Sequence, residues 1–293
     1  MNLLMTTIEQ GLIYALLGTG VYVTFRILKI SDLTVEGTFP MGALITAGLI
    51  TSGVNPFLAT LIASLAGMIP GLISALLAIK LKIDNLLAGI LTMTMMYSIN
   101  LRINGRSNVP ISDAKSIFNI INTGNAYVDR IIVLAVIVLI GKFALDLFMT
   151  TKTGYMLIVT GDNKSLVRSL GQEPDKYTII GLMIANAYVA LSGSLLAQSM
   201  KFADAQMGTG VIVIALASVI IGLTTFRNTD LNGSTRAIIG AIIYKIIGTL
   251  AIQAGLNPND LKLINGLIVI GFIAYNNFYT NRRTKNATHK KLI

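Results

Sequence analysis

The sequence has 293 residues, of which 54% are hydrophobic and only 12% are charged, and its mean hydropathy is +0.73. Soluble domains carry about a quarter charged residues, so this composition excludes a water-soluble globular fold. The net charge is +10. The basic residues lie between apolar runs and in the tail, a pattern that favours contact with anionic lipid over nucleic acid. Cysteine is absent, which excludes disulfides, thiol catalysis and thiolate metal sites.

Long uncharged runs recur along the chain, and crossing about 30 Å of hydrocarbon takes about 20 mostly apolar residues. The run between Glu36 and Lys80 holds 43 uncharged residues, and Gly53-Val54-Asn55-Pro56 supplies a turn between two crossings within it. We therefore predict an all-α, polytopic transmembrane helical bundle that forms a single domain over residues 1–293. About nine spans (eight to ten) are expected, at 3–25, 37–51, 56–79, 85–101, 130–149, 176–200, 208–226, 237–254 and 262–280. A further segment within 103–129 stays open.

The orientation of the bundle follows from the loops. Alternate loops place 15 Lys and Arg residues on one side and 6 on the other. Because cytoplasmic loops are enriched in Lys and Arg, the side with 15 is predicted to be cytoplasmic, with the C-terminus inside and the N-terminus outside. The first run has no basic residue before it and no evident cleavage site after it, so we expect it to stay in the membrane.

The short second span begins with Gly37-Thr38-Phe39-Pro40. Gly and Pro weaken helical hydrogen bonding, and freed backbone within a membrane must line a cavity or be buried in protein. We therefore expect this span to be broken near Gly37–Pro40. For Glu36, a role in a pathway and a solvated helix cap at the inner interface both stay open. For Asp32, the solvated cap is the preferred interpretation.

Lys245 lies near the middle of the predicted span 237–254. A lysine at this depth costs about 2.5–3.5 kcal/mol on translocon scales, so it should face the bundle interior. Snorkelling along a tilted helix is the alternative. The predicted residues of a pathway or gate are Glu36, Gly37, Thr38, Phe39, Pro40, Met41 and Lys245.

Other polar residues within the spans have structural interpretations. Lys142 and Asp146 are four residues apart and are predicted to form a salt bridge. Asn100, Asn186 and Gln198 are expected to bond neighbouring helices, with contact to a polar substrate as the alternative. The Gly67–Gly71 segment, with Pro70 inside it, predicts close helix packing or a kink.

The longest hydrophilic stretch on the inner side is 150–176, and it contains a predicted short helix. Asp162 is placed to cap this helix and Gly171 to end it. Leu166, Val167 and Leu170 would form one apolar strip along it. The pattern leaves two interpretations open: a docking helix beneath the bundle, or a surface helix that only packs against the bundle.

Three blocks of the sequence resemble a known family. They are Gly11 to Ala47 (GLIYALLGTGVYVTFRILKISDLTVEGTFPMGALITA), Thr153 to Ala197 (TGYMLIVTGDNKSLVRSLGQEPDKYTIIGLMIANAYVALSGSLLA), and Gly208-Thr209-Gly210 with the apolar residues to Gly222. They resemble ABC-importer inner-membrane permeases of the branched-chain amino acid and monosaccharide class, above all the bacterial tryptophan/tyrosine-type branch.

This resemblance implies a permease domain in the bacterial cytoplasmic membrane, paired with a second permease copy as a homodimer. Two cytoplasmic ATPase subunits and an external substrate-binding protein would complete the importer. The solute would be small, and an aromatic amino acid is favoured over a sugar or nucleoside. The loop 150–176 would then be the coupling loop, with an ATPase-coupling helix made of Gly161, Asp162, Asn163, Lys164, Ser165, Leu166, Val167, Arg168, Ser169, Leu170 and Gly171.

The sequence does not predict an enzyme, a resident cofactor or a metal site. It has no G-x-x-x-x-G-K-[ST] phosphate loop, so ATP-Mg would be bound by a partner subunit. Its one histidine is His289 in the tail, which excludes a histidine-based triad or proton relay. The runner-up functions are an ion-coupled secondary carrier and a membrane scaffold. A carrier would need carboxylates within the spans, for which only Asp146 and Glu36 are identified as candidates.

Overall fold

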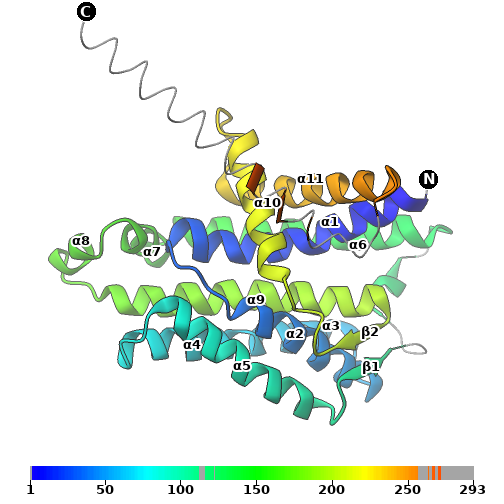
Figure 1. Ribbon diagram of the computed structural model, residues 1–293, viewed down its shortest axis with the longest axis horizontal. Helices are drawn as coiled ribbons and strands as arrows, with labels where there is room; N and C mark the ends of the chain where they lie inside the picture. Colours follow the sequence, from blue (N-terminus) through cyan, green and yellow to red (C-terminus); the bar gives the residue numbers. More distant parts are fainter. Residues whose placement is uncertain are drawn as a thin grey trace, which may run out of the picture.

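The computed structural model of the chain describes residues 2–111, 116–121 and 123–256, with isolated positions at 263, 266, 267, 270 and 271. Helix α9 (Pro174–Met200) lies in the middle of a bundle of long helices (Figure 1). It packs against α1 (Asn2–Val21) on one side and against α2 (Val35–Thr51) and α4 (Met68–Lys80) on the other. Of the α9 span, 61% is buried, so α9 forms the core of the described fold.

The remaining elements follow in chain order. They are the π-helical turn η1 (Tyr22–Ile27), α3 (Pro56–Ala66), α5 (Asn85–Ile103), β1 (Asn108–Pro110), the 3₁₀ turn η2 (Ile117–Ile120), α6 (Ala126–Thr150), α7 (Lys152–Asp162), α8 (Lys164–Ser169), β2 (Phe202–Asp204), α10 (Val211–Thr225) and α11 (Gly233–Gln253). Helices α7 and α8 lie at one end of the bundle, called here the α8 end. The N-terminus and the two strands lie at the opposite end, called here the strand end (Figure 1).

The all-α, polytopic membrane fold is confirmed. Five described segments are long and apolar enough to cross a membrane: Pro56–Lys80, Asn85–Ile103, Ala126–Thr150, Pro174–Met200 and Gly233–Gln253. Val35–Thr51 and Val211–Thr225 are shorter apolar helices. Each of the first eight predicted spans coincides with a helix or a pair of consecutive helices. The predicted ninth span, 262–280, lies outside the described residues apart from the isolated positions.

The second span differs from its prediction, because α2 is one continuous helix that passes through Gly37 and Pro40. Proline lacks an N–H, so it leaves the carbonyl of Glu36 without its usual helical donor. The backbone at Gly208 packs directly against that carbonyl, at a distance that leaves no room for a side chain. Neighbouring protein thus covers the weak point, and the predicted break near Gly37–Pro40 is wrong.

The helix of the third span is interrupted at Gly67, where α3 ends and α4 begins. A Cβ added at Gly67 would lie 2.7 Å from the carbonyl oxygen of Asn186, and one added at Gly71 would lie 2.8 Å from the carbonyl carbon of Leu182. Both glycines therefore bring this span close to α9. The close packing predicted for this segment is confirmed.

The strand end is closed by a small antiparallel ladder that the sequence did not predict. Asn108 pairs with Asp204, Val109 with Ala203 and Pro110 with Phe202. The ladder connects the segment after α5 to the segment after α9. The described part of 103–129 holds β1 and η2 and no long additional helix.

Candidate functional site

The short helix predicted within 150–176 is present as α8, and its ends are defined by local hydrogen bonds. The side chain of Asn163 accepts from the backbone N–H of Ser165 at 3.0 Å and of Leu166 at 3.2 Å. Gly171 follows the helix with φ +70°, a left-handed conformation that glycine adopts without strain. The predicted end at Gly171 is confirmed. The cap is Asn163, and the prediction of Asp162 as the cap is wrong.

The apolar strip of α8 is divided between two faces. Val167 is fully buried in a cluster with residues of η1, α7 and α9. Leu166 and Leu170 are 47% and 54% exposed. They are four residues apart and so share one face of the helix, whereas Val167 is turned by about 100° from Leu166. The outward face of α8 therefore presents two leucines that are about half exposed.

Asp162 has a different role from the one predicted. It ends α7 and lies 2.8 Å from the ammonium of Lys29, which follows η1. The hydrogen bond and positive charge of Lys29 hold the pKa of this exposed carboxyl below its usual value. Gly161 packs against the backbone of Ile27, with no room for a Cβ. The remaining predicted coupling residues, Lys164, Ser165, Arg168 and Ser169, are exposed.

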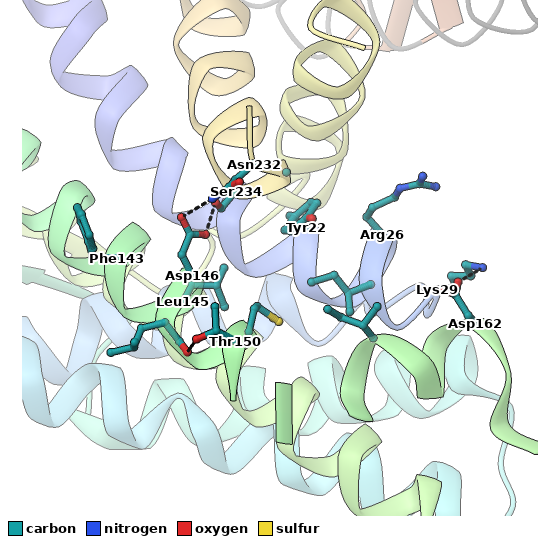
Figure 2. Close-up of a pocket in the computed structure, with 15 residues that line it drawn as sticks. Tyr22, Arg26, Lys29, Phe143, Leu145, Asp146, Thr150, Asp162, Asn232 and Ser234 are labelled. Atoms are coloured by element: carbon teal, nitrogen blue, oxygen red, sulfur yellow. Dashed lines mark hydrogen bonds and ion pairs between the residues drawn. The ribbon is translucent and has the colours of Figure 1, made fainter. Parts of the chain in front are cut away.

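A cavity of about 700 Å³ opens at the α8 end between η1, α6, α7 and the start of α11 (Figure 2). Asp146 lies in its wall. Its carboxylate is 2.7 Å from the ammonium of Lys142 and accepts from the Ser234 hydroxyl at 2.5 Å and from the Asn232 amide at 3.1 Å. The predicted salt bridge is confirmed, and the same carboxylate also ties α6 to α11.

We expect Asp146→Ala to lower the free energy of unfolding by about 1–3 kcal/mol. The change removes three hydrogen bonds and leaves Lys142 without its partner, although partial exposure limits the cost. Thermal unfolding in detergent measures this. The double variant Lys142→Met with Asp146→Met is the control, and it should recover part of the loss because no charge stays unpaired. If Asp146→Ala unfolds at the wild-type temperature, the hydrogen bonds that Asp146 makes between α6 and α11 contribute nothing to stability.

The predicted pathway residues on α2 lie on two sides of that helix. Thr38, Phe39 and Met41 are buried, at 0%, 0% and 5% exposure. Glu36 and Pro40, with Gly37, instead line a second cavity of about 290 Å³ between α2, α5 and the segment before α10. We call it the Glu36 cavity.

The Glu36 carboxylate accepts the backbone N–H of Gly210 at 3.1 Å. Gly210 is the N-cap of α10 and has φ +80°. The positive end of the α10 dipole therefore faces the carboxylate. Glu36 is thus a wall residue of the cavity, and it fixes the start of α10 against the start of α2.

Asp32 is buried rather than solvated. It is 3% exposed, accepts the backbone N–H of Thr34 at 2.9 Å, and accepts the side-chain amide of Asn186 on α9 at 2.9 Å. The other side of that amide accepts from the Thr38 hydroxyl at 2.7 Å. The interpretation of Asp32 as a solvated cap is wrong. The expected helix-bonding role of Asn186 is confirmed, because its side chain links α9 to the η1–α2 connection and to α2 itself.

Lys245 does not line the Glu36 cavity but is connected to α2 through one aromatic ring. Its ammonium lies 3.7 Å from the ring centroid of Tyr14 on α1, a cation–π contact. The Tyr14 ring in turn stacks on Phe39, with centroids 6.2 Å apart. Lys245 thus directs its charge toward α1 within the bundle, and Tyr14 links two predicted site residues that the sequence alone did not connect.

The two other predicted amides also join helices. Gln198 accepts from the backbone N–H of Ile117 at 2.9 Å and donates to the Thr60 hydroxyl at 2.8 Å. Asn100 donates to the backbone carbonyl of Gly37 at 3.0 Å. Its side-chain oxygen is buried and has no hydrogen-bond partner among the described residues.

Sequence analysis missed a buried acid in the first span. Glu9 on α1 is 2% exposed, accepts from the Ser199 hydroxyl at 2.5 Å and lies 3.4 Å from the guanidinium of Arg130. Arg130 also lies over the ring of Phe118, 5.9 Å from its centroid. The sequence did contain a signal of this buried acid, because Glu9 is an acidic residue within an apolar run. Its partners, however, are more than a hundred residues away.

Residues 3–274 match the family described as "Branched-chain amino acid transport system / permease component". The chain belongs to this family of ABC-type transport permeases. The matched range includes α8, the Glu36 cavity and Lys245.

Several curated proteins are similar over most of the chain. A protein of Clostridioides difficile (strain R20291) named "Tyrosine transport system permease protein" is 41% identical over 98% of this chain and 96% of its own length. An uncharacterized protein of Rickettsia prowazekii (strain Madrid E) is 36% identical over 92% and 96%. The D-allose transport system permease protein of Escherichia coli (strain K12) is 28% identical over 89% and 78%.

Family membership decides between the functional classes that the sequence left open. The chain is a permease component of a transporter in the membrane, as the resemblance implied, and not an ion-coupled carrier or a scaffold. The named relatives are transport components and not enzymes. The permease therefore moves a solute, and its buried polar groups are to be understood within a transport bundle.

Proposed function

We propose that this permease is a subunit of an ABC importer that carries a small solute, an amino acid and preferably an aromatic one, across the bacterial cytoplasmic membrane. It acts as a homodimer with two cytoplasmic ATPase subunits and an external binding protein. The α8 end and the C-terminus face the cytoplasm, and the strand end faces outward. ATP-Mg is bound by the ATPase subunits.

The outward face of α8 is the observation that carries this proposal. Leu166 and Leu170 are exposed, although the same helix is packed against the bundle through Val167. Apolar side chains left open on a short, firmly seated helix are typical of a docking surface. A groove on the ATPase that takes these two leucines would move α8 when the ATPase subunits close.

The packing also suggests how that movement reaches the solute. Val167 contacts the cluster that holds Ile27, Leu28 and Ile30. This segment continues through Asp32 into α2, whose first turn carries Glu36. A displacement of α8 would therefore pull on the start of α2 and change the Glu36 cavity, in the manner of packed helices that shift together.

The exposed side of α5 supports a second permease copy next to the Glu36 cavity. Thr94, Tyr97 and Ser98 are exposed on α5, and only 28% of this span is buried. Polar side chains within a membrane preferentially face protein or a wet cavity. A second copy against α5 would enclose the Glu36 cavity and place it beside the dimer axis. Among the residues of the predicted gate, Glu36, Gly37 and Pro40 would then border the pathway.

Substrate preference rests on the relatives. The tyrosine transport permease is 41% identical to this chain, whereas the D-allose permease is 28% identical. An amino acid is therefore favoured, and a sugar or nucleoside is the second candidate.

Reconstitution tests this function. We expect the permease to copurify with its ATPase partner subunits. Liposomes that hold this complex and the cognate binding protein should accumulate radiolabelled L-tyrosine only with ATP. Excess phenylalanine or tryptophan should compete, and ribose or adenosine should not. If only ribose competes, the transported solute is a sugar and not an amino acid. Uptake that follows a sodium or proton gradient without ATP would overturn the importer.

A further inference from the structure

The cavity of about 700 Å³ between η1, α6, α7 and the start of α11, called here the α8-end cavity, has an apolar wall on α6. Phe143 and Leu147 line this wall, and they are 71% and 70% exposed. They are four residues apart and so share one face of α6, a membrane span of which only 22% is buried. The cavity is therefore continuous with the exposed surface of α6 within the membrane.

The charged groups of the cavity leave one positive charge without an ion-pair partner. Its lining contains two acids, and each has a lysine: Asp146 pairs with Lys142 at 2.7 Å and Asp162 with Lys29 at 2.8 Å. Arg26 also lines the cavity and is exposed, and no ion pair among the described residues includes it. Lys29 and, to a smaller extent, Arg26 lower the pKa of Asp162. The cavity therefore favours an anion at Arg26.

The apolar wall and the cations lie on different sides of the cavity. Figure 2 shows Phe143 across the cavity from Arg26 and Lys29. Phe143 precedes the end of α6 at Thr150 by seven residues, which places it about 10 Å deeper in the bundle. Arg26 instead lies in the last turn of η1, beside the ion pair that joins Lys29 to the end of α7. The arrangement matches a molecule with a charged head at the α8 end and an apolar tail toward the middle of the membrane.

The volume and the position of the cavity favour a phospholipid headgroup over a soluble partner. Its volume lies within the range of about 300–1,000 Å³ that is usual for small-molecule pockets. A whole phospholipid is larger, so its acyl chains would leave the cavity along Phe143 and Leu147. Both residues belong to the span Ala126–Thr150, and a soluble subunit does not enter the hydrocarbon.

We infer that the α8-end cavity binds an anionic phospholipid of the cytoplasmic leaflet. Arg26 and Lys29 hold its phosphate, and Phe143 and Leu147 contact its acyl chains. A guanidinium matches a phosphate through two parallel N–H groups, and basic pockets between transmembrane helices on the cytoplasmic side suit such headgroups. This inference rests on the proposed function for one point, which is that the α8 end faces the cytoplasm.

Such a lipid would support the segment that α8 displaces in the proposed mechanism. Ile27 lines the cavity and belongs to the same buried cluster as Val167 of α8. A headgroup between η1 and α6 would therefore stabilise the packing through which α8 acts on the start of α2.

Thermal unfolding of the full-length permease in detergent, with added lipid, tests this site. The probes are phosphatidylglycerol, phosphatidylcholine with the same acyl chains, and inorganic phosphate. Each titration gives the concentration for half of the shift in unfolding temperature. Phosphatidylglycerol, which has a net negative charge, should act at a concentration at least about tenfold lower than phosphatidylcholine. Inorganic phosphate should produce no shift, because it has no chains to contact α6.

Arg26→Gln isolates the charge. The half-stabilising concentration of phosphatidylglycerol should rise about tenfold or more, because hydrogen bonds to charged groups are roughly twice as strong as neutral ones. Arg26 is exposed, so the variant should fold. Arg227→Gln is the matched control: it makes the same change at an exposed arginine between α10 and α11 that does not line the cavity. It should keep the wild-type value.

Four results would each overturn the lipid site. They are equal half-stabilising concentrations for the two lipids, stabilisation by inorganic phosphate alone, an unchanged value in Arg26→Gln, and an equal rise in Arg227→Gln. The last would show that overall charge attracts the lipid. A second permease copy against the apolar wall would also overturn it, and oxidation of Phe143→Cys in this cysteine-free chain would then link two copies by a disulfide.

The lipid titrations need no ATPase, so they separate this site from the importer itself. Copurification with the ATPase and ATP-dependent uptake are measured on the same preparation. A permease that passes both measurements and does not distinguish the two lipids refutes only the site. A permease that binds no ATPase refutes the proposed function, whereas a preference for phosphatidylglycerol that depends on Arg26 would still support the site.

Discussion

Replacing Leu166 and Leu170 together with aspartate is expected to release the permease from its ATPase subunits and to reduce uptake to background. In the proposed complex both side chains enter an apolar groove, where an aspartate would be an unpaired charge. Burying such a charge costs several kcal/mol or forces the contact open. Each 1.4 kcal/mol weakens binding about tenfold, so two substitutions should remove detectable association.

Folding of the permease should survive this change, because both leucines are about half exposed. Val167 offers the contrast within the same helix. It is fully buried between η1, α7 and α9, so Val167→Asp should lower the yield of folded permease. The measurements are copurification with the ATPase, uptake, and the amount of monodisperse permease in detergent.

Leu81→Asp is the matched control. Leu81 is 64% exposed at the end of α4, and it undergoes the same chemical change. Association and uptake should stay near wild type in this variant. If the Leu166 and Leu170 double variant also retains wild-type copurification and uptake, the coupling assignment is wrong, and α8 only packs against the bundle.

The spans could be predicted from the sequence because hydrocarbon imposes one strong requirement on every crossing. Apolar length alone located α5, α6, α9 and α11 to within a few residues. The short helix α8 was also foreseen, since Gly171 and the leucine spacing are local signals. The sequence did not predict which side of α8 would be buried, because the packing of α8 against η1 and α9 determines this.

The errors concern residues whose partners are distant in the chain. Local rules placed a break at Gly37 and Pro40, but Gly208 packs against the weakened turn and the helix continues. Asp32 was assigned to solvent because its amide partner, Asn186, lies 154 residues away. Neither contact has a sequence signature, because each depends on a partner that only the fold brings close. In the sequence, a buried acid and a solvated helix cap have the same local pattern.

The close approach of α2 to α9 predicts that replacing glycine with alanine has opposite effects on stability at Gly42 and at Gly248. A Cβ added at Gly42 would lie 2.7 Å from the Cα of Ala190, inside the backbone of α9. A backbone atom cannot rotate away as a side chain can, so Gly42→Ala must separate the two helices. At Gly248 on α11 an added Cβ meets nothing within 4 Å.

Gly42→Ala should therefore lower the free energy of unfolding by about 1–3 kcal/mol or more, the usual cost of overpacking. Gly248→Ala should raise it by about 0.5–1 kcal/mol, because alanine restricts the unfolded chain and favours helix more than glycine does. Thermal unfolding of both variants in the same detergent measures the difference. A Gly42→Ala protein that unfolds at or above the wild-type temperature would mean that α2 and α9 are not in backbone contact. The path inferred from α8 through α2 to the Glu36 cavity would then lose its rigid support.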